Sequence, residues 1–197
     1  MNSQDGHYSF RSTKGAQTHA SLLDAAFALI AEGGIYDLTI AKVCDATGLK
    51  RSSFYTHFRD MDDLIGALSI RVLDEFGPGH IDADAHSGEN KSVLKARLDF
   101  VFAEIERRPA LGHVIHELVA FEIKSFEAVM ERVLSDVRQD IRKGVLSIRR
   151  DDAPAFAHAI SATVVSLLKM SKSKWKDQLD QQQTVGLLLR AGGLKEH

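Results

Sequence analysis

The sequence predicts an all-α protein, with an N-terminal three-helix head joined to a C-terminal helical bundle. Only three prolines interrupt the 197 residues, and the stretches between them are rich in Ala, Leu, Glu, Lys and Arg, which favour helix. Apolar residues recur every three to four positions, and no segment shows sustained alternation of β-branched residues. A hydrophobic content of 44% is enough to build a core.

The first predicted helix covers about residues 16–32 and follows a polar N-terminal arm, residues 1–15. Glycines at positions 33 and 34 are expected to end it, because glycine accepts the left-handed conformation common at helix ends. Its apolar residues fall on one stripe at helical spacing: Leu22, Leu23, Ala26, Phe27 and Ile30.

Two short helices separated by a glycine turn are predicted between residues 39 and 58. Thr39 is a suitable N-cap for the first, which we expect to end near residue 46. The turn at Gly48 lets the second helix cross the first steeply, and Phe54 and Phe58 face the core. This is the helix-turn-helix pattern, in which the second helix enters the major groove of DNA.

The outer face of the second short helix carries many hydrogen-bond donors and no acid. No Asp or Glu occurs from residue 50 to residue 59, although ordinary solvent-facing helices often include them. The whole chain has a net charge of −2, so a local patch rather than bulk charge must hold DNA. The candidate phosphate and base-edge ligands are Lys50, Arg51, Ser52, Ser53, Tyr55, Thr56 and His57.

A fourth helix should begin after Asp60, an N-cap candidate, and reach about Phe76, where Gly77, Pro78 and Gly79 stop it. A polar loop is expected up to about residue 90. The helices predicted beyond it cover about residues 91–108, a short segment begun by Pro109, then 116–146, 154–172 and 181–191.

The sequence resembles the TetR family of bacterial transcription regulators. The resemblance is carried by residues 39–49 (TIAKVCDATGL), 54–58 (FYTHF) and 62–64 (DDL), and it covers roughly residues 16–70. It implies a flexible arm at 1–15, a helix-turn-helix DNA-binding domain at 16–62, and a ligand-binding and dimerisation domain at 63–197.

The resemblance also implies roles for single residues. Thr39 would cap its helix and touch a phosphate, Tyr55 and His57 would contact the DNA backbone, and the remaining candidates are Arg11, Lys14, Lys50 and Thr56. Arg51, Ser52 and Ser53 would face base edges. Two departures stand out: the family usually has Ser or Thr at the position of Lys50, and Lys at the position of Met61.

By the same resemblance, the chain is expected to be a repressor that binds double-stranded DNA as a homodimer and leaves its operator when a small-molecule effector binds. An activator or a helical partner-binding protein of the same fold is the alternative. Aromatic and polar residues of the second half are candidates for the effector site, although most aromatics should be core: Phe102, His116, Phe121, Phe126 and Phe156.

The sequence indicates no enzyme, cofactor or metal site. It contains no glycine-rich phosphate loop, serine elbow or paired cysteines. His113, His116 and Glu117 share one helix face and could bind an inducer or a metal, but their order is not a known zinc-protease signature, and a solvated or hydrogen-bonded face is the favoured interpretation. Cys44 is the only cysteine and is expected to be buried rather than a redox switch. No apolar run reaches about 18 residues and no signal peptide is visible, so we expect a cytoplasmic protein that does not span a membrane.

Overall fold

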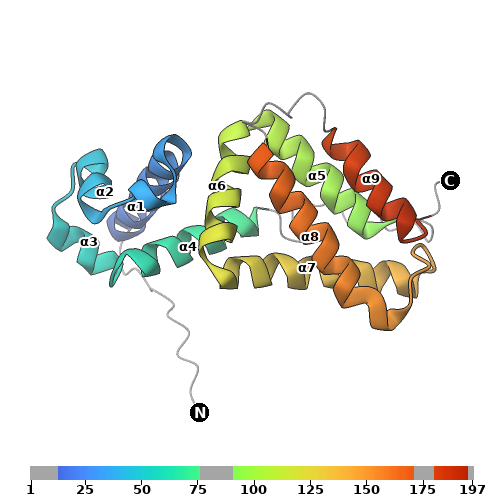
Figure 1. Ribbon diagram of the computed structural model, residues 1–197. Coiled ribbons are helices and arrows are strands. Elements are labelled where there is room, and N and C mark those ends of the chain that lie inside the picture. Colours follow the sequence, from blue (N-terminus) through green and yellow to red (C-terminus); the bar gives the residue numbers. More distant parts are fainter. Residues whose placement is uncertain (1–12, 76–90, 171–179, 195–197) are drawn as a thin grey trace, which may run out of the picture. The chain divides into compact units, whose positions relative to one another are not determined.

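The computed structural model describes residues 13–75, 91–170 and 180–194. Within them the chain forms nine α-helices and two single 3-10 turns, and no β-strand (Figure 1). This confirms the predicted all-α class. The predicted stop at residues 77–79, the loop up to residue 90, Arg11 and the helix end at 172 lie outside the described residues.

The chain divides into two compact units, and the division falls after Leu68. The N-terminal unit comprises a helix-turn-helix and the helices on either side of it, as the sequence predicts. Its elements are α1 (Thr13–Gly33), the 3-10 turn η1 (Ile35–Asp37), α2 (Ile40–Thr47), α3 (Arg51–His57) and the first part of α4 (Met61–Asp74). The predicted boundary, after residue 62, falls in the first turn of α4. The first helix begins at residue 13, inside the segment expected to be a flexible arm.

The core of the N-terminal unit is built from the stripes that the sequence predicts. Phe54 of α3 and Phe58, the residue after α3, are completely or almost completely buried, and so are Val43 and Cys44 of α2. The burial of Cys44 confirms its prediction as a small core residue. From α1, the buried residues are Leu22, Leu23, Ala26 and Ile30. These contacts fix the short helices α2 and α3, which are too short to be stable alone.

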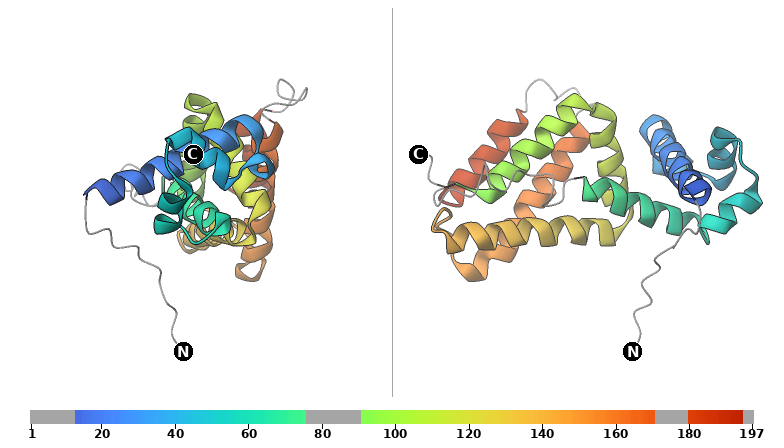
Figure 2. Two further views of the ribbon diagram at one scale, coloured as in Figure 1. Left: turned by 90° about the vertical axis from the view of Figure 1, so that its left-hand side faces the viewer. Right: turned by 180° about the vertical axis from the view of Figure 1, so that it is seen from behind.

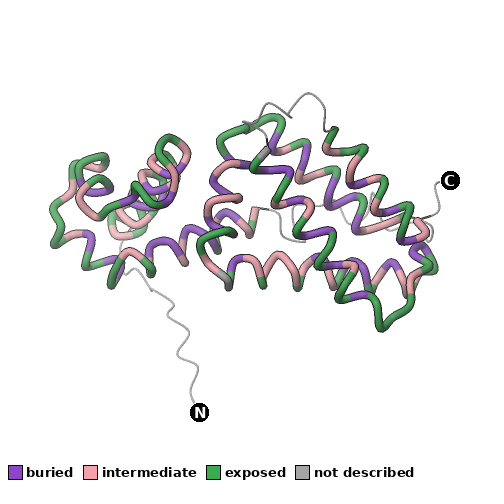
Figure 3. The backbone as a smooth tube through the Cα atoms, viewed as in Figure 1, coloured by how far each residue is buried: buried purple, intermediate pink, exposed green. Residues whose placement is uncertain are grey.

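The C-terminal unit is a bundle of helices around one continuous apolar core. Its elements are the last part of α4, α5 (Val93–Arg107), α6 (Pro109–Phe121), α7 (Ile123–Arg142), the 3-10 turn η3 (Arg150–Asp152), α8 (Ala153–Met170) and α9 (Gln181–Ala191). Helix α8 packs against α6, α7 and α9, and α5 packs against α7 (Figures 1 and 2). Buried and exposed residues alternate along the helices of both units (Figure 3).

The single long helix predicted over residues 116–146 is wrong, because α6 ends at Phe121 and α7 begins at Ile123. Glu122 between them is extended, with φ −116° and ψ 115°. Neither glycine nor proline marks this break in the sequence. It lets α6 and α7 each pack on α8, so tertiary packing overrides local helix propensity. The end of α7 at Arg142 is also earlier than predicted, because Gly144 takes a left-handed conformation with φ 70°.

Candidate nucleic-acid interface and interior cavity

The helix-turn-helix has the local geometry that its sequence predicts. The Thr39 hydroxyl accepts a hydrogen bond from the Lys42 amide at 3.2 Å, which caps the start of α2. Gly48 lies at φ 68°, and the Leu49 amide donates to the Cys44 carbonyl at 3.0 Å. A residue with a Cβ is strained at such a φ, so glycine makes the tight reversal between α2 and α3 possible.

Helix α3 presents most of its predicted polar residues outward. Lys50, Arg51, Ser52 and Thr56 are exposed, and the Tyr55 ring keeps 57% of its surface accessible. Neither Lys50 nor Arg51 forms an ion pair with the residues that the structure describes, so both charges remain available. Ser53 is half-buried, and the Thr56 hydroxyl donates to the Ser52 carbonyl at 3.0 Å.

His57 departs from the expectation that it faces outward. Only 7% of its surface is accessible, and its ring centroid lies 6.0 Å from that of His19 on α1. The reason lies in helical spacing, because His57 is three residues after Phe54 and therefore shares its inward face. Burial lowers the pKa of His57, which favours the neutral imidazole. His57 is therefore part of the buried face of α3 and does not present a positive charge at the surface.

The start of α3 lacks a side-chain cap, as its sequence predicts. Lys50 occupies the N-cap position and its side chain makes no capping hydrogen bond. A charge thus replaces the usual capping oxygen there. The start of α4 is capped instead, since the Asp63 amide donates to Asp60 Oδ1 at 2.8 Å and the Arg59 amide donates to Asp63 Oδ2 at 2.9 Å.

One exposed aromatic close in sequence to the interface was not predicted. Tyr36 lies in η1, three residues before the Thr39 cap, and 89% of its surface is accessible. Beside it in sequence, Asp37 pairs with Lys42 at 2.5 Å. The sequence signal for Tyr36 was weak, because a single tyrosine in a short connection has no periodicity.

The C-terminal unit encloses a cavity of about 70 Å³ between α5, α6, α7, α8 and the last turn of α4. Its walls are mainly valine, leucine and isoleucine side chains. Three polar residues also line it: Arg97 of α5, Arg132 of α7 and Ser161 of α8. A largely apolar interior with a few polar groups is typical of sites that accept small molecules.

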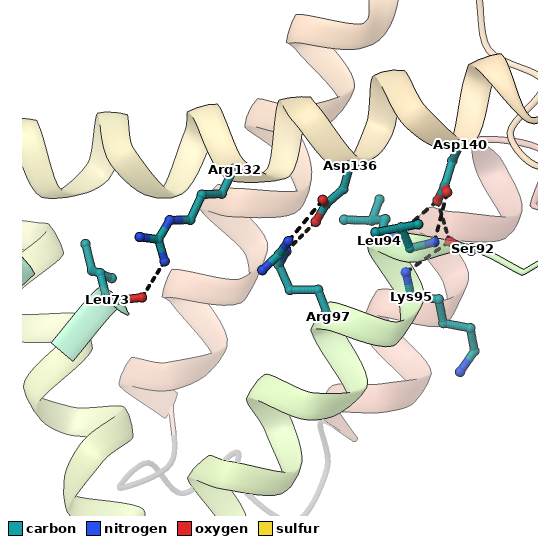
Figure 4. Close-up of polar contacts among 9 residues, drawn as sticks. Leu73, Ser92, Leu94, Lys95, Arg97, Arg132, Asp136 and Asp140 are labelled. Atoms are coloured by element: carbon teal, nitrogen blue, oxygen red, sulfur yellow. Dashed lines mark hydrogen bonds and ion pairs between the residues drawn. The ribbon is translucent and has the colours of Figure 1, made fainter. Parts of the chain in front are cut away.

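Both arginines of the cavity wall are paired within the C-terminal unit (Figure 4). Arg97 makes two hydrogen bonds to the buried carboxylate of Asp136, one through Nε and one from Nη2 to Oδ1 at 3.1 Å. Arg132 donates to the Leu73 carbonyl and, through Nη2, to Asp74 Oδ1 at 3.0 Å. The two residues it holds form the end of α4, and Leu73 also lines the cavity.

A second buried carboxylate lies one turn beyond Asp136 on α7. Asp140 accepts hydrogen bonds from the Ser92 hydroxyl at 2.5 Å and from the Val93 and Leu94 amides at 2.9 and 3.2 Å, at the start of α5 (Figure 4). Burial raises the pKa of Asp140, although these three bonds oppose the shift. The group joins α7 to α5 and thereby holds two walls of the cavity together.

None of the residues predicted for the effector site lines this cavity. Phe102 is part of the apolar core, Phe126 packs edge-on against His158 with ring centroids 5.7 Å apart, and Phe121 is exposed. His116 is half-buried, and Phe156 packs against the core. The prediction relied on aromatic content, whereas the cavity walls are aliphatic.

Metal and membrane features are not found in the part of the chain that the structure describes. No three His, Cys, Asp or Glu side chains there are grouped to hold a metal ion, and this includes the region of His116. None of the described helices combines the length and the apolar character needed to cross a membrane.

Comparison with known proteins identifies the N-terminal unit. Residues 22–68, which contain all of α2 and α3, match the family model described as "Bacterial regulatory proteins, tetR family". Over these residues the chain is similar to the TetR family. The matched residues include Lys50, the N-cap of α3 whose side chain makes no capping hydrogen bond.

The chain matches curated transcriptional regulators over part of their length. It is 29% identical over 111 residues to the HTH-type transcriptional regulator AcrR of Shigella flexneri, covering 53% of this chain and 51% of that protein. It is 37% identical over 68 residues to an uncharacterized HTH-type transcriptional regulator of Haemophilus influenzae, covering 34% and 31%. The matches thus span about half or less of these relatives.

Solved structures share the fold over nearly the whole chain. A TetR-family regulator of Pectobacterium atrosepticum has a TM-score of 0.67 at 19% identity and covers 94% of this chain and 99% of its own. RolR in complex with resorcinol has a TM-score of 0.65 at 19% identity, covering 94% and 92%. The SmeT–triclosan complex has a TM-score of 0.66 at 19% identity, covering 91% and 93%.

Proposed function

We propose that this chain is a transcriptional repressor that binds double-stranded DNA as a homodimer and leaves its operator when a small molecule occupies the C-terminal unit. The observation that carries the proposal is the outer face of α3, which is polar, free of acids and exposed after a capped α2 and a glycine turn. The proposed contact residues are Thr39, Lys50, Arg51, Ser52, Ser53, Tyr55 and Thr56.

The chemistry of this face suits a DNA groove. Arg51 at the start of α3 can donate two hydrogen bonds to one guanine edge, which is the commonest specific contact in the major groove. Tyr55 and Thr39 can bind phosphates on either side, and Lys50 adds a positive charge close to the polyanion. With a net charge of −2, the chain depends on this local patch for its affinity.

A homodimer is proposed because one short helix reads too few bases. Two heads about 34–36 Å apart, or a multiple of that distance, would read a palindromic site on one side of the duplex. We place the proposed dimer interface on α8 and α9 of the C-terminal unit. Three small exposed residues of α8 permit close helix packing: Ala155, Ala159 and Ala162. On α9, Leu187 is 63% exposed.

The cavity supplies the proposed effector site, and α4 supplies the connection. Helix α4 follows α3 closely in the sequence and is continuous from Met61 to Asp74. Its last turn lines the cavity and binds Arg132. A ligand that fits better with that turn displaced would favour a state with lower DNA affinity. RolR and SmeT, which share this fold, were solved with resorcinol and triclosan.

The test is an unbiased selection of duplexes from a random DNA pool by the full-length chain, followed by affinity measurements. We expect a palindromic sequence to be enriched. Arg51→Ala should weaken binding to it by about fivefold to more than a hundredfold, corresponding to a loss of about 1–3 kcal/mol, and Tyr55→Phe should weaken it less. Enrichment of no sequence would contradict the proposal.

Arg149→Ala is the matched control for charge. Arg149 lies in the C-terminal unit, is exposed, and has only exposed carboxylates within 4 Å in the described residues, at 3.7 and 3.9 Å. Removing it changes the net charge as Arg51→Ala does, but should leave DNA affinity unchanged. Circular dichroism and sedimentation must show that all three variants fold and associate like the wild type.

A further inference from the structure

The cavity of the C-terminal unit offers a ligand almost no polar surface. Most of its wall is valine, leucine and isoleucine, and the atoms that face its interior are nearly all carbon. Ser161 belongs to this wall, but neighbouring protein atoms cover its Oγ. A molecule inside the cavity therefore cannot form a hydrogen bond with the serine.

The two arginines of the wall are also closed to a ligand. Arg97 is bound to the buried carboxylate of Asp136. Arg132 donates to the Leu73 carbonyl and to Asp74. An anion that separated Arg97 from Asp136 would leave a buried charge uncompensated, which is strongly unfavourable. Both arginines thus line the cavity with the carbon atoms of their side chains rather than with their charges.

We propose that the cavity binds a small, uncharged molecule without hydrogen-bonding groups, of the class of one-ring hydrocarbons. Such a molecule gives up no hydrogen bond to water when it enters, and burial of its apolar surface favours binding. A hydroxyl or carboxylate on the ligand would lose its water and gain no partner, which costs affinity. The inference rests on the proposed function in taking this cavity as the effector site, and it adds the chemical class of the effector.

The size of the cavity suits a ligand of about one ring. A single water needs about 10–15 Å³ of this kind of space, and the cavity offers about 70 Å³. Water is a poor occupant, because a stable water needs two to four polar partners. Dry cavities lined by apolar side chains are known to bind molecules such as benzene. An apolar ring therefore matches both the volume and the walls.

The experiment compares three one-ring probes by calorimetric titration of the full-length protein without DNA. Toluene has no hydrogen-bonding group, phenol has a hydroxyl in place of the methyl, and benzoate carries a charge. We expect one toluene to bind per chain, phenol to bind at least about fivefold more weakly, and benzoate to show no binding. No binding of toluene, or binding of phenol or benzoate as tight as that of toluene, would overturn the proposal.

Val164→Thr tests the cavity wall itself, because threonine has nearly the shape of valine but adds a hydroxyl. Val164 is buried on α8 and lines the cavity. The new hydroxyl gives phenol a partner, so the preference for toluene over phenol should narrow about two- to tenfold. If circular dichroism shows that this variant does not fold, Val129→Thr makes the same change in the part of the wall that α7 provides.

Val185→Thr on α9 is the matched control. Val185 is also buried in the C-terminal unit, but it does not line the cavity. This variant should leave the preference for toluene over phenol unchanged. An unchanged preference in Val164→Thr, or an equal narrowing in Val185→Thr, would place the bound ring outside this cavity and overturn the proposal.

These measurements need no DNA, so they separate the ligand class from the proposed function. If toluene binds as expected but the DNA selection enriches no sequence, the proposed function is wrong and the ligand class stands. If a palindromic duplex is enriched but toluene does not bind, the ligand class alone is wrong.

Discussion

The two units of this chain use polar residues in opposite ways. In the N-terminal unit, α3 turns Arg51 and Tyr55 to the outside above an apolar core. In the C-terminal unit, Arg97 and Asp136 form an ion pair inside the bundle, and the surface of the cavity is aliphatic. The first arrangement suits a charged macromolecule that binds from solvent, and the second suits a small apolar molecule that enters the interior. Four predictions sharpen this contrast.

The largest effect is expected when the buried ion pair of the C-terminal unit is broken. Arg97→Met should lower the free energy of unfolding by about 3–5 kcal/mol, because Asp136 stays buried without its partner. Urea unfolding measures the change. The exposed pair formed by Lys95 and Asp99 on the same helix is the control, and Lys95→Met should cost less than about 1 kcal/mol. Equal costs would show that burial does not set the strength of these pairs.

Removing a helix cap should likewise cost more stability in the C-terminal unit than in the N-terminal unit. Ser92→Ala removes the cap of α5 and a hydrogen bond to the buried Asp140, so we expect a cost of about 2 kcal/mol. Thr39→Ala removes only an exposed cap of α2 and should cost about 1 kcal/mol. Urea unfolding of both variants gives the two values, and a larger cost for Thr39→Ala would reverse the comparison.

Two glycine-to-alanine substitutions should change stability in opposite directions. Gly48→Ala places a Cβ at φ 68° in the turn before α3 and should destabilise the N-terminal unit by about 1 kcal/mol, although the space around it is open. Gly186→Ala lies inside α9, where the new methyl meets only the flexible end of Arg190 at 3.3 Å. It should stabilise the C-terminal unit by about 0.4–1 kcal/mol. Thermal unfolding followed by circular dichroism distinguishes the two signs.

The smallest effect concerns pH. Burial lowers the pKa of His57, so below about 6.5 the unfolded chain binds a proton that the folded N-terminal unit resists. The contribution of His57 to stability is therefore complete above about pH 6.5 and is lost as the pH falls toward the lowered pKa. His57→Gln should remove this dependence between pH 7 and 5. The exposed His158→Gln should retain it, and an unchanged pH profile in His57→Gln would show that His57 is not its source.

The contrast also explains what could be predicted from the sequence. The candidate interface lies within twenty consecutive residues, where Thr39, Gly48 and Phe54 have the spacing of a known motif, so its cap, turn and core were predicted correctly. His57 was predicted to face outward because the motif it belongs to suggested a phosphate contact, although it lies three residues after the buried Phe54. That spacing, available in the sequence, already indicated the inward face.

The cavity could not be predicted in this way, because its wall is assembled from five helices. Leu73, Arg97 and Ser161 are far apart in the sequence and meet only after the bundle has formed. Sequence periodicity predicts that Leu73 faces inward, but it does not show which residues of the other helices Leu73 meets. The break at Glu122, which separates α6 from α7, was missed for the same reason, since packing on α8 rather than a local signal places it.

The central claim is that the outer face of α3 binds the phosphates and bases of a duplex. Its most direct test is the affinity of the wild type and of Arg51→Ala for the selected duplex, measured between about 50 and about 200 mM salt. We predict that the logarithm of the wild-type affinity falls linearly with the logarithm of salt concentration, and that Arg51→Ala binds more weakly throughout with a shallower slope. An affinity independent of salt, or equal in the two proteins, would contradict it.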